Sequence, residues 1–180
     1  KDQPQWVYPP VGHVANGPSG VTWLTGESVP EDLRGQFLLT NYRGAPNSSN
    51  TLAVQLEPKG AGFHFKGARE VISGVAAADV ELGYDGRLYF ADYGGGWSVN
   101  VNGSIQVLEP KDPALLKAGA ATAQLFAKGL GDHDLKQLQA LLSHPDQRVR
   151  KLAQFELVER GAKGKSVLLA GAQSKDASLL

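Results

Sequence analysis

A repeat with a period of about 50 residues constrains the fold of this chain more than any other feature of its sequence. Residues 86–97 read as a strand with a glycine turn at each end, and residues 35–44 carry Gly, Tyr and Gly at matching places. The match continues after each copy, where residues 54–58 correspond to residues 106–110 and both segments end in Leu-Glu-Pro. Such a period, with several short strands in each unit, is typical of the blades of a β-propeller.

Each unit contains short segments rich in β-branched and aromatic residues, separated by turns. The first unit predicts strands at residues 20–24, 36–41, 51–56 and 62–72, with a break near Gly67, and one helical turn or surface loop at residues 27–34. The second predicts strands at residues 78–82, 87–92 and 104–108, with an Asp-Gly hairpin turn within residues 83–86. This second unit lacks a fourth strand, and two incomplete blades cannot close a ring of roughly four to eight blades.

From residue 113 onward the spacing of apolar residues changes from two to about 3.6, which indicates helices. Helices are predicted at residues 114–128, with an interruption at Gly119, at residues 134–143, at residues 147–160 and from about residue 165 onward. We therefore expect a mainly β chain with a C-terminal α segment. Residues 1–112 would form about two blades of an incomplete propeller, and residues 113–180 a helical segment.

Residues 138–157 resemble a HEAT repeat, in which a helix, a His-Pro-Asp turn and a second helix opening with Arg-Val-Arg follow one another. A single repeat of this kind cannot bury both of its faces, and about three are needed for a stable stack. The resemblance therefore implies that the chain is a fragment of a longer protein.

The first 110 residues resemble the C-terminal part of the propeller in the glucose and sorbosone dehydrogenase-like family, in segments 16–20, 30–39, 74–80, 85–89 and 95–97. They are more similar to large bacterial membrane-bound dehydrogenase-like proteins, in which a propeller, HEAT repeats and a c-type haem domain follow one another. The resemblance implies an exported oxidoreductase of the periplasm or cell envelope. It also implies pyrroloquinoline quinone, calcium or a c-type haem as cofactors of the full protein.

This chain departs from the family where the cofactor would bind. Quinone-dependent members carry Arg-x-Arg-Asp-Val before the corresponding strand, and here Ala76, Ala77 and Ala78 precede Asp79. Alanine supplies no bidentate donor to a carboxylate, so this chain is expected to bind no quinone in that manner. The chain has no cysteine, which excludes disulfides, thiolate zinc sites and a covalently attached c-type haem within it.

The charge and hydropathy of the chain limit the classes of partner that we expect it to bind. Eighteen basic and eighteen acidic residues give no net charge, and no basic cluster occurs, so nucleic acid is not an expected partner. No apolar run approaches the roughly 20 residues that span a bilayer. The polar first residues and the absence of methionine lead us to expect a processed product or an internal fragment. The expected partner is the remainder of the propeller or another protein chain.

Four residues are candidates for ligand binding, and each has a structural alternative. Asp79 and Asp92 could direct carboxylates into a propeller channel, or each could accept backbone N–H bonds in a turn. Arg43 could clamp an anionic ligand, or form a solvated contact or an ion pair between blades. Trp97 could stack on a sugar, or pack between blades. No catalytic residue is assigned, and the four scattered histidines lack metal-ligand spacing, so no metal site is predicted.

Two functional hypotheses follow. In the first, the chain is a structural part of an exported sugar or alcohol dehydrogenase-like protein, whose catalytic blades and haem domain lie elsewhere. In the second, it is a non-catalytic propeller and HEAT module that binds other protein chains. Whether the whole protein is an enzyme stays open at this point.

Overall fold

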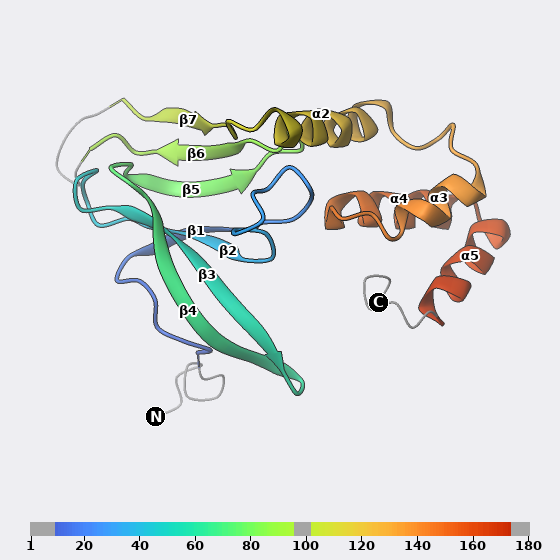
Figure 1. The fold of residues 1–180 in the computed structure, drawn as a ribbon, viewed down its shortest axis with the longest axis horizontal. Coiled ribbons are helices and arrows are strands. Elements are labelled where there is room, and N and C mark those ends of the chain that lie inside the picture. Colours follow the sequence, from blue (N-terminus) through green and yellow to red (C-terminus); the bar gives the residue numbers. More distant parts are fainter. Residues whose placement is uncertain (1–9, 96–101, 174–180) are drawn as a thin grey trace. The chain divides into compact units, whose positions relative to one another are not determined.

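A computed structural model describes residues 10–95 and 102–173 of the chain. In this part the chain forms two antiparallel sheets, of four and three strands, followed by four helices (Figure 1). Antiparallel strands followed by helices were predicted, and this order is confirmed. The described part is mixed rather than mainly β, because helices take 30% of its residues and strands 31%.

The first sheet has the strand order β1-β2-β3-β4, so each strand pairs with its neighbour in sequence. The strands are β1 (Pro18–Trp23), β2 (Phe37–Asn41), β3 (Asn50–Lys59) and β4 (Gly62–Ser73). The break predicted near Gly67 is a shift of register, because Gln55 pairs with Gly67 and Leu56 pairs with Phe65. The hairpin of β3 and β4 therefore continues past that glycine.

The second sheet has the order β5-β6-β7 and repeats the start of the first. Its strands are β5 (Ala77–Leu82), β6 (Leu88–Asp92) and β7 (Ser104–Leu108). Pairing of β6 with β7 is regular from Leu88 opposite Leu108 to Asp92 opposite Ser104. Among the described residues no ring of sheets is closed.

The helices are α2 (Pro113–Lys128), α3 (Leu135–Leu141), α4 (Gln147–Glu159) and α5 (Ala162–Ala172). The predicted interruption of the first helix at Gly119 is wrong, since α2 is continuous there. The last helix begins at Ala162, earlier than predicted. The side chains of Asp112, Asp134 and Asp146 cap the first three helices by accepting backbone N–H bonds.

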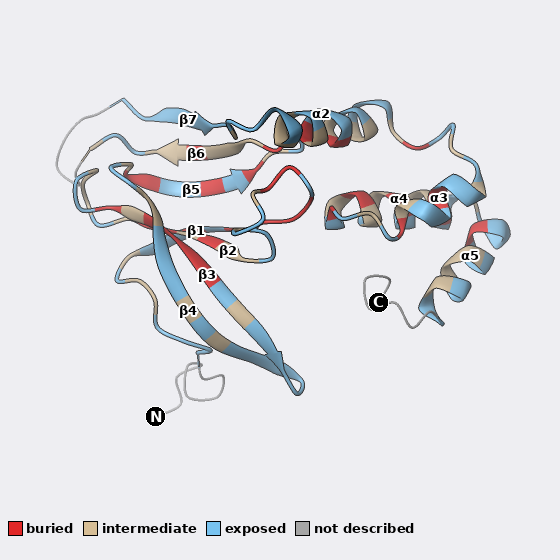
Figure 2. Cartoon of the chain, viewed as in Figure 1, coloured by how far each residue is buried: buried red, intermediate tan, exposed pale blue. Residues whose placement is uncertain are grey.

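The chain divides into two compact units that alternate along the sequence. The first comprises residues 1–24, 35–82 and 88–108 and contains both sheets. The second comprises residues 25–34, 83–87 and 109–180, so two loops between strands belong with the helices. Each unit has buried apolar residues (Figure 2): Leu38, Val80 and Phe90 in the first, and Leu138, Ala153 and Leu157 in the second.

Within the first unit the two sheets meet along β1 and β5. The Ser19 hydroxyl donates to the Ala77 carbonyl at 3.0 Å, and the Leu82 amide donates to the Thr22 hydroxyl at 3.4 Å. A Cβ atom on Gly20 would lie 2.3 Å from Asp79 Oδ1, so the close approach of these strands requires glycine there. Polar side chains of β1 thus satisfy backbone groups of β5.

Candidate functional site

Asp79 and Asp92 lie on paired strands but are separated by an irregularity in the pairing. Asp79 is opposite Ala91, whereas Asp92 is opposite Ala77. Oδ1 of Asp79 accepts the Val80 amide at 2.8 Å, and Oδ1 of Asp92 accepts the Gly94 amide at 2.9 Å. One oxygen of each carboxylate is therefore engaged by a backbone amide close by in sequence, and the bond from Asp92 to the amide two residues on is that of an Asx turn.

Arg43 is exposed in the loop that follows β2. Its amide donates to the Ser49 hydroxyl at 2.9 Å, and its carbonyl accepts from the Ser48 hydroxyl at 3.0 Å. Serine side chains thus fix the backbone of this exposed residue. Trp97, the fourth candidate, lies outside the described residues.

Tyr42 and Tyr93 connect the end of β2 with the end of β6. Their rings meet edge to face, with centroids 5.7 Å apart, and the Tyr42 hydroxyl donates to the Gly95 carbonyl at 3.2 Å. Removal from water, and next the proximity of Tyr93, raise the pKa of the Tyr42 phenol. The folded chain thus favours the neutral phenol at position 42.

We expect the free energy of unfolding to decrease as pH rises, because the Tyr42 phenol ionises less readily in the folded chain than in the unfolded chain. Because its folded pKa is raised, its stabilising effect is present below the unfolded pKa of about 10 and is lost as pH rises through the folded value. Chemical denaturation of the wild type and Tyr42→Phe across this range measures the effect. The variant should lose less stability with rising pH, and equal slopes in the two proteins would contradict the assignment.

A shallow hollow of about 440 Å³ lies beside Asp92. Ala78, Ala91, Tyr93 and Ile105 supply most of its lining, and Asp92 is the one charged residue on its described wall. Besides Asp92, the described lining residue with a proton-transferring side chain is Tyr93. The hollow therefore offers a small ligand a carboxylate, a phenol and apolar contacts.

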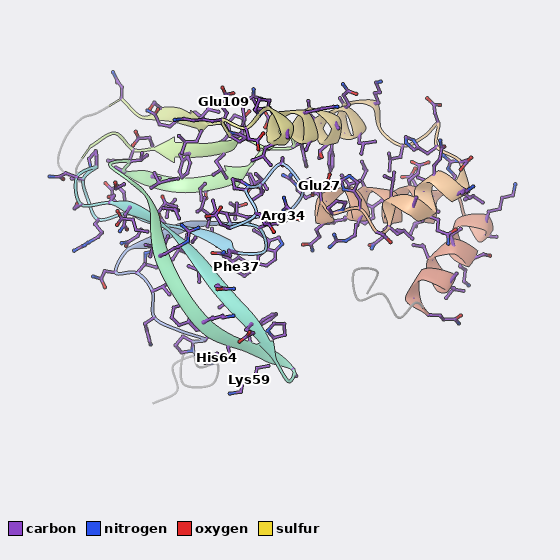
Figure 3. All side chains as sticks on the ribbon, in the orientation of Figure 1. Glu27, Arg34, Phe37, Lys59, His64 and Glu109 are labelled. Atoms are coloured by element: carbon purple, nitrogen blue, oxygen red, sulfur yellow. The ribbon has the colours of Figure 1, made fainter. Side chains whose placement is uncertain are left out.

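Metal ligands do not gather in the described residues. No group of three or more His, Asp or Glu residues there could hold an ion. His64, labelled on the hairpin of β3 and β4 in Figure 3, stands opposite Glu57 in the strand pairing. Among the described helices, none is both long enough and apolar enough to cross a membrane.

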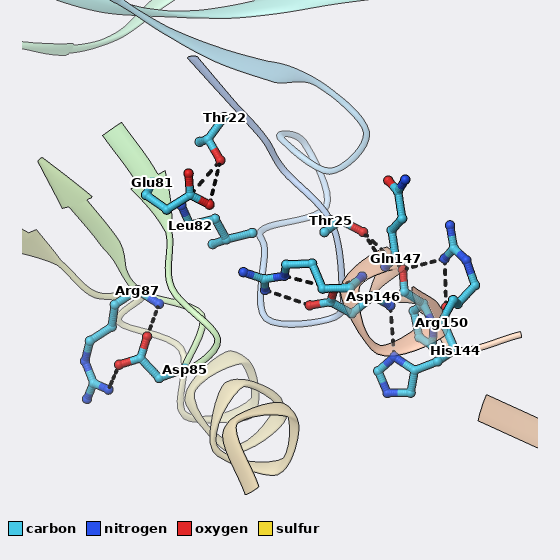
Figure 4. A network of polar contacts seen from close by, with 12 residues as sticks. Thr22, Thr25, Glu81, Leu82, Asp85, Arg87, His144, Asp146, Gln147 and Arg150 are labelled. Carbon is cyan, nitrogen blue, oxygen red and sulfur yellow. Dashed lines mark hydrogen bonds and ion pairs between the residues drawn. The ribbon is translucent and has the colours of Figure 1, made fainter. Parts of the chain in front are cut away.

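The Asp146 carboxylate in the second unit belongs to a network of polar contacts (Figure 4). It is 1% exposed, accepts the Arg148 amide at 2.8 Å, and pairs with the Arg148 guanidinium at 2.7 Å. The Asp146 amide donates to Nδ1 of His144 at 3.0 Å. The aspartate of the His-Pro-Asp turn thus caps α4 and compensates its own burial through an ion pair.

The loop at residues 25–34 packs on this turn. The Thr25 hydroxyl donates to the Pro145 carbonyl at 3.3 Å and accepts the Gln147 amide at 3.1 Å. Gly26 has a φ of +92° and stands close to Asp146, because an added Cβ atom would lie 3.0 Å from Oδ2. One hydroxyl therefore joins two chain segments about 120 residues apart in sequence.

The turn at residues 83–87 contacts helices α2 and α4, which are also distant from it in sequence. The Tyr84 ring stacks on Phe126 of α2 at 3.8 Å, and the Arg148 guanidinium lies 5.1 Å from the Tyr84 centroid. The Arg87 guanidinium donates to the carboxylates of Asp85 and Glu109, and all three side chains are partly exposed. These hydrogen bonds, first the one to Asp85 and next the one to Glu109, raise the pKa of Arg87. The turn is thus fixed by both aromatic and charged contacts to the helical unit.

No family model, curated protein or solved structure matches this chain.

Sequence reasoning missed the residues of the second unit that join distant segments. Asp146 precedes an amphipathic helix, which is a signal for a helix cap, but the sequence pattern was used only to place it in the His-Pro-Asp turn between two helices. Thr25 and Tyr84 gave no signal, because their partners lie far away in sequence.

Proposed function

We propose that this chain is a structural connector, with propeller-type blades joined to a HEAT-type helical hairpin, in an exported dehydrogenase-like protein. The repeat in sequence and the shared strand order of the two sheets support the propeller assignment. The capped helix α4, which follows α3 after the His-Pro-Asp turn, supports the HEAT assignment.

One observation carries the connecting role: the loops that leave the strands are built into the helical unit. Thr25 and Gly26 contact the turn before α4, and Tyr84 contacts α2. The chain therefore passes between the strands and the helical unit at both of these loops as well as at residue 109. Such attachment suits a segment whose role is to hold two kinds of domain in one protein.

The residues before Asp79 argue against quinone binding by this segment. The two arginines of the family motif would stand at positions 76 and 78. Ala76 is 0% exposed, so an arginine there would require a cavity for its side chain, and the exposed Ala78 has no guanidinium to bind a carboxylate. Oxidation of a sugar or related alcohol would therefore take place in other blades of the full protein, with quinone, calcium or haem held there. Asp79 and Asp92 would stabilise turns and strands.

Oxidation assays of the intact protein test this proposal. We expect quinone- or dye-linked oxidation of a sugar, with kcat/KM unchanged in Asp79→Asn and Asp92→Asn, since each substitution retains an oxygen that can accept the backbone bond. No oxidation of any supplied sugar by protein loaded with its cofactor would reject the dehydrogenase assignment. A large loss of kcat in Asp92→Asn would instead make Asp92 catalytic.

A second function, that of a protein-interaction module, is favoured by the apolar surface that the described residues leave in water. All residues of β7 are exposed, and Phe155 and Val158 of α4 are 58% and 64% exposed. Exposed apolar strands and helix faces of this kind mark interaction sites. This role is compatible with the first, because a connector can also bind a partner chain.

A further inference from the structure

The outer edge of β7 is an open sheet edge in the described part of the chain. β7 pairs with β6 on one side, and the order β5-β6-β7 places no described strand on the other. Figure 2 shows the strand exposed along its length. Its large apolar residues, Ile105, Val107 and Leu108, are 65%, 48% and 43% exposed.

The edge strand β4 of the four-stranded sheet differs from β7 in its charge and in its pairing. β4 carries Lys66, Arg69 and Glu70, and its pairing with β3 shifts register twice. Charges and irregular pairing are devices that keep an edge strand from pairing with another chain. β7 has no charged residue, no proline and no register shift, so it has none of these devices.

We propose that β7 pairs antiparallel with β7 of a second copy of this chain, about a two-fold axis at Gln106. This inference deepens the second function above by naming the partner, and it puts β7 of the second copy in the place of the fourth strand that the blade lacks. In this register Ile105 of each copy lies opposite Val107 of the other copy, and the two Gln106 residues lie opposite each other. β-branched residues opposite each other stabilise a strand pair, and a two-fold interface requires such a self-complementary surface.

The sequence of β7 favours this register and this partner. All five residues overlap when Gln106 is central, whereas a slip of one residue places Ile105 opposite glutamine and moves side chains to the other face. The strand has no charge that would repel its own copy, and none that would select an oppositely charged strand. The Gln106 amide donates to the Ser104 hydroxyl at 3.0 Å, which holds the glutamine against its own strand.

Analytical ultracentrifugation of the full chain over a concentration series tests the pairing. We expect a reversible dimer for the wild type and a mass that falls by half in Ile105→Lys and in Val107→Glu, because each places a charge opposite an apolar residue. Both positions are exposed, so the fold should persist, and circular dichroism checks this. Phe63→Lys is the matched control: Phe63 is 59% exposed on β4, and its variant should still dimerise.

Mixing the two variants tests the register. The lysine introduced at position 105 of one copy would lie opposite the glutamate introduced at position 107 of the other, so the mixture should form a dimer that neither variant forms alone. A monomeric wild type, an equal loss in Phe63→Lys, or failure of the mixture to associate would each overturn the proposal. None of these results depends on the oxidation assay, so the two proposals can fail separately.

Discussion

Replacing Gly119 with alanine is expected to destabilise the helical unit by about 2 kcal/mol, although alanine is the better helix former by about 1 kcal/mol. Gly119 is buried in the middle of α2, where the turn at residues 83–87 crosses the helix. A Cβ atom there would lie 2.0 Å from the Asp85 carbonyl oxygen and 2.6 Å from its carbon. Because these are backbone atoms, relief requires the helix or the turn to move.

Thermal and chemical unfolding followed by the helical signal in circular dichroism measures the change in the free energy of unfolding. Gly171→Ala is the matched control, because this glycine is also helical and an added Cβ atom would meet only Leu142 Cδ1 at an ordinary 3.7 Å. That variant should gain up to about 1 kcal/mol. If Gly119→Ala is as stable as Gly171→Ala, the turn at residues 83–87 does not lie against α2 as described.

The sequence predicts the elements well where the signal is local. Strand β7 has the predicted bounds, and β5 differs by one residue, because alternation of apolar residues and nearby turn residues define a strand. Gly119 shows where this reasoning fails. A single glycine costs a long helix only about 1 kcal/mol, so it does not end α2, and what it provides is room for another segment.

The candidate site was predicted less well, for a physical reason. A carboxylate such as Asp92 can be assigned to a strand end from sequence, but its partners decide its role, and the Gly94 amide next to it is one of them. The junction around Asp146 depends on Thr25, about 120 residues away, and on Tyr84 beside Arg148. Contacts at such separations follow from tertiary packing, which no pattern in a single sequence displays.

Replacing Asp146 with alanine is expected to cost about 3 kcal/mol of stability, because it removes one partner of a largely buried ion pair. The Arg148 side chain would keep its charge at 22% exposure, and α4 would lose its cap. Asp146→Asn should have an intermediate effect, since it keeps an acceptor for the Arg148 amide and removes the charge. Asp112→Ala is the control: this exposed aspartate caps α2 through Ala114 at 2.8 Å, and its loss should cost about 1 kcal/mol.

Limited proteolysis distinguishes loss of the junction from loss of a helix cap. A glutamate-specific protease cleaves after Glu27 and Glu31, which are both exposed in the loop at residues 25–34. Thr25 and Gly26 hold the start of this loop against the turn before α4. Asp146→Ala should accelerate cleavage at these two positions, because the loop loses the surface on which it packs. Asp112→Ala should leave the cleavage rate there unchanged. If the two variants are cut alike, the loop is not held by the Asp146 turn, and the connecting role proposed for this chain loses its main support.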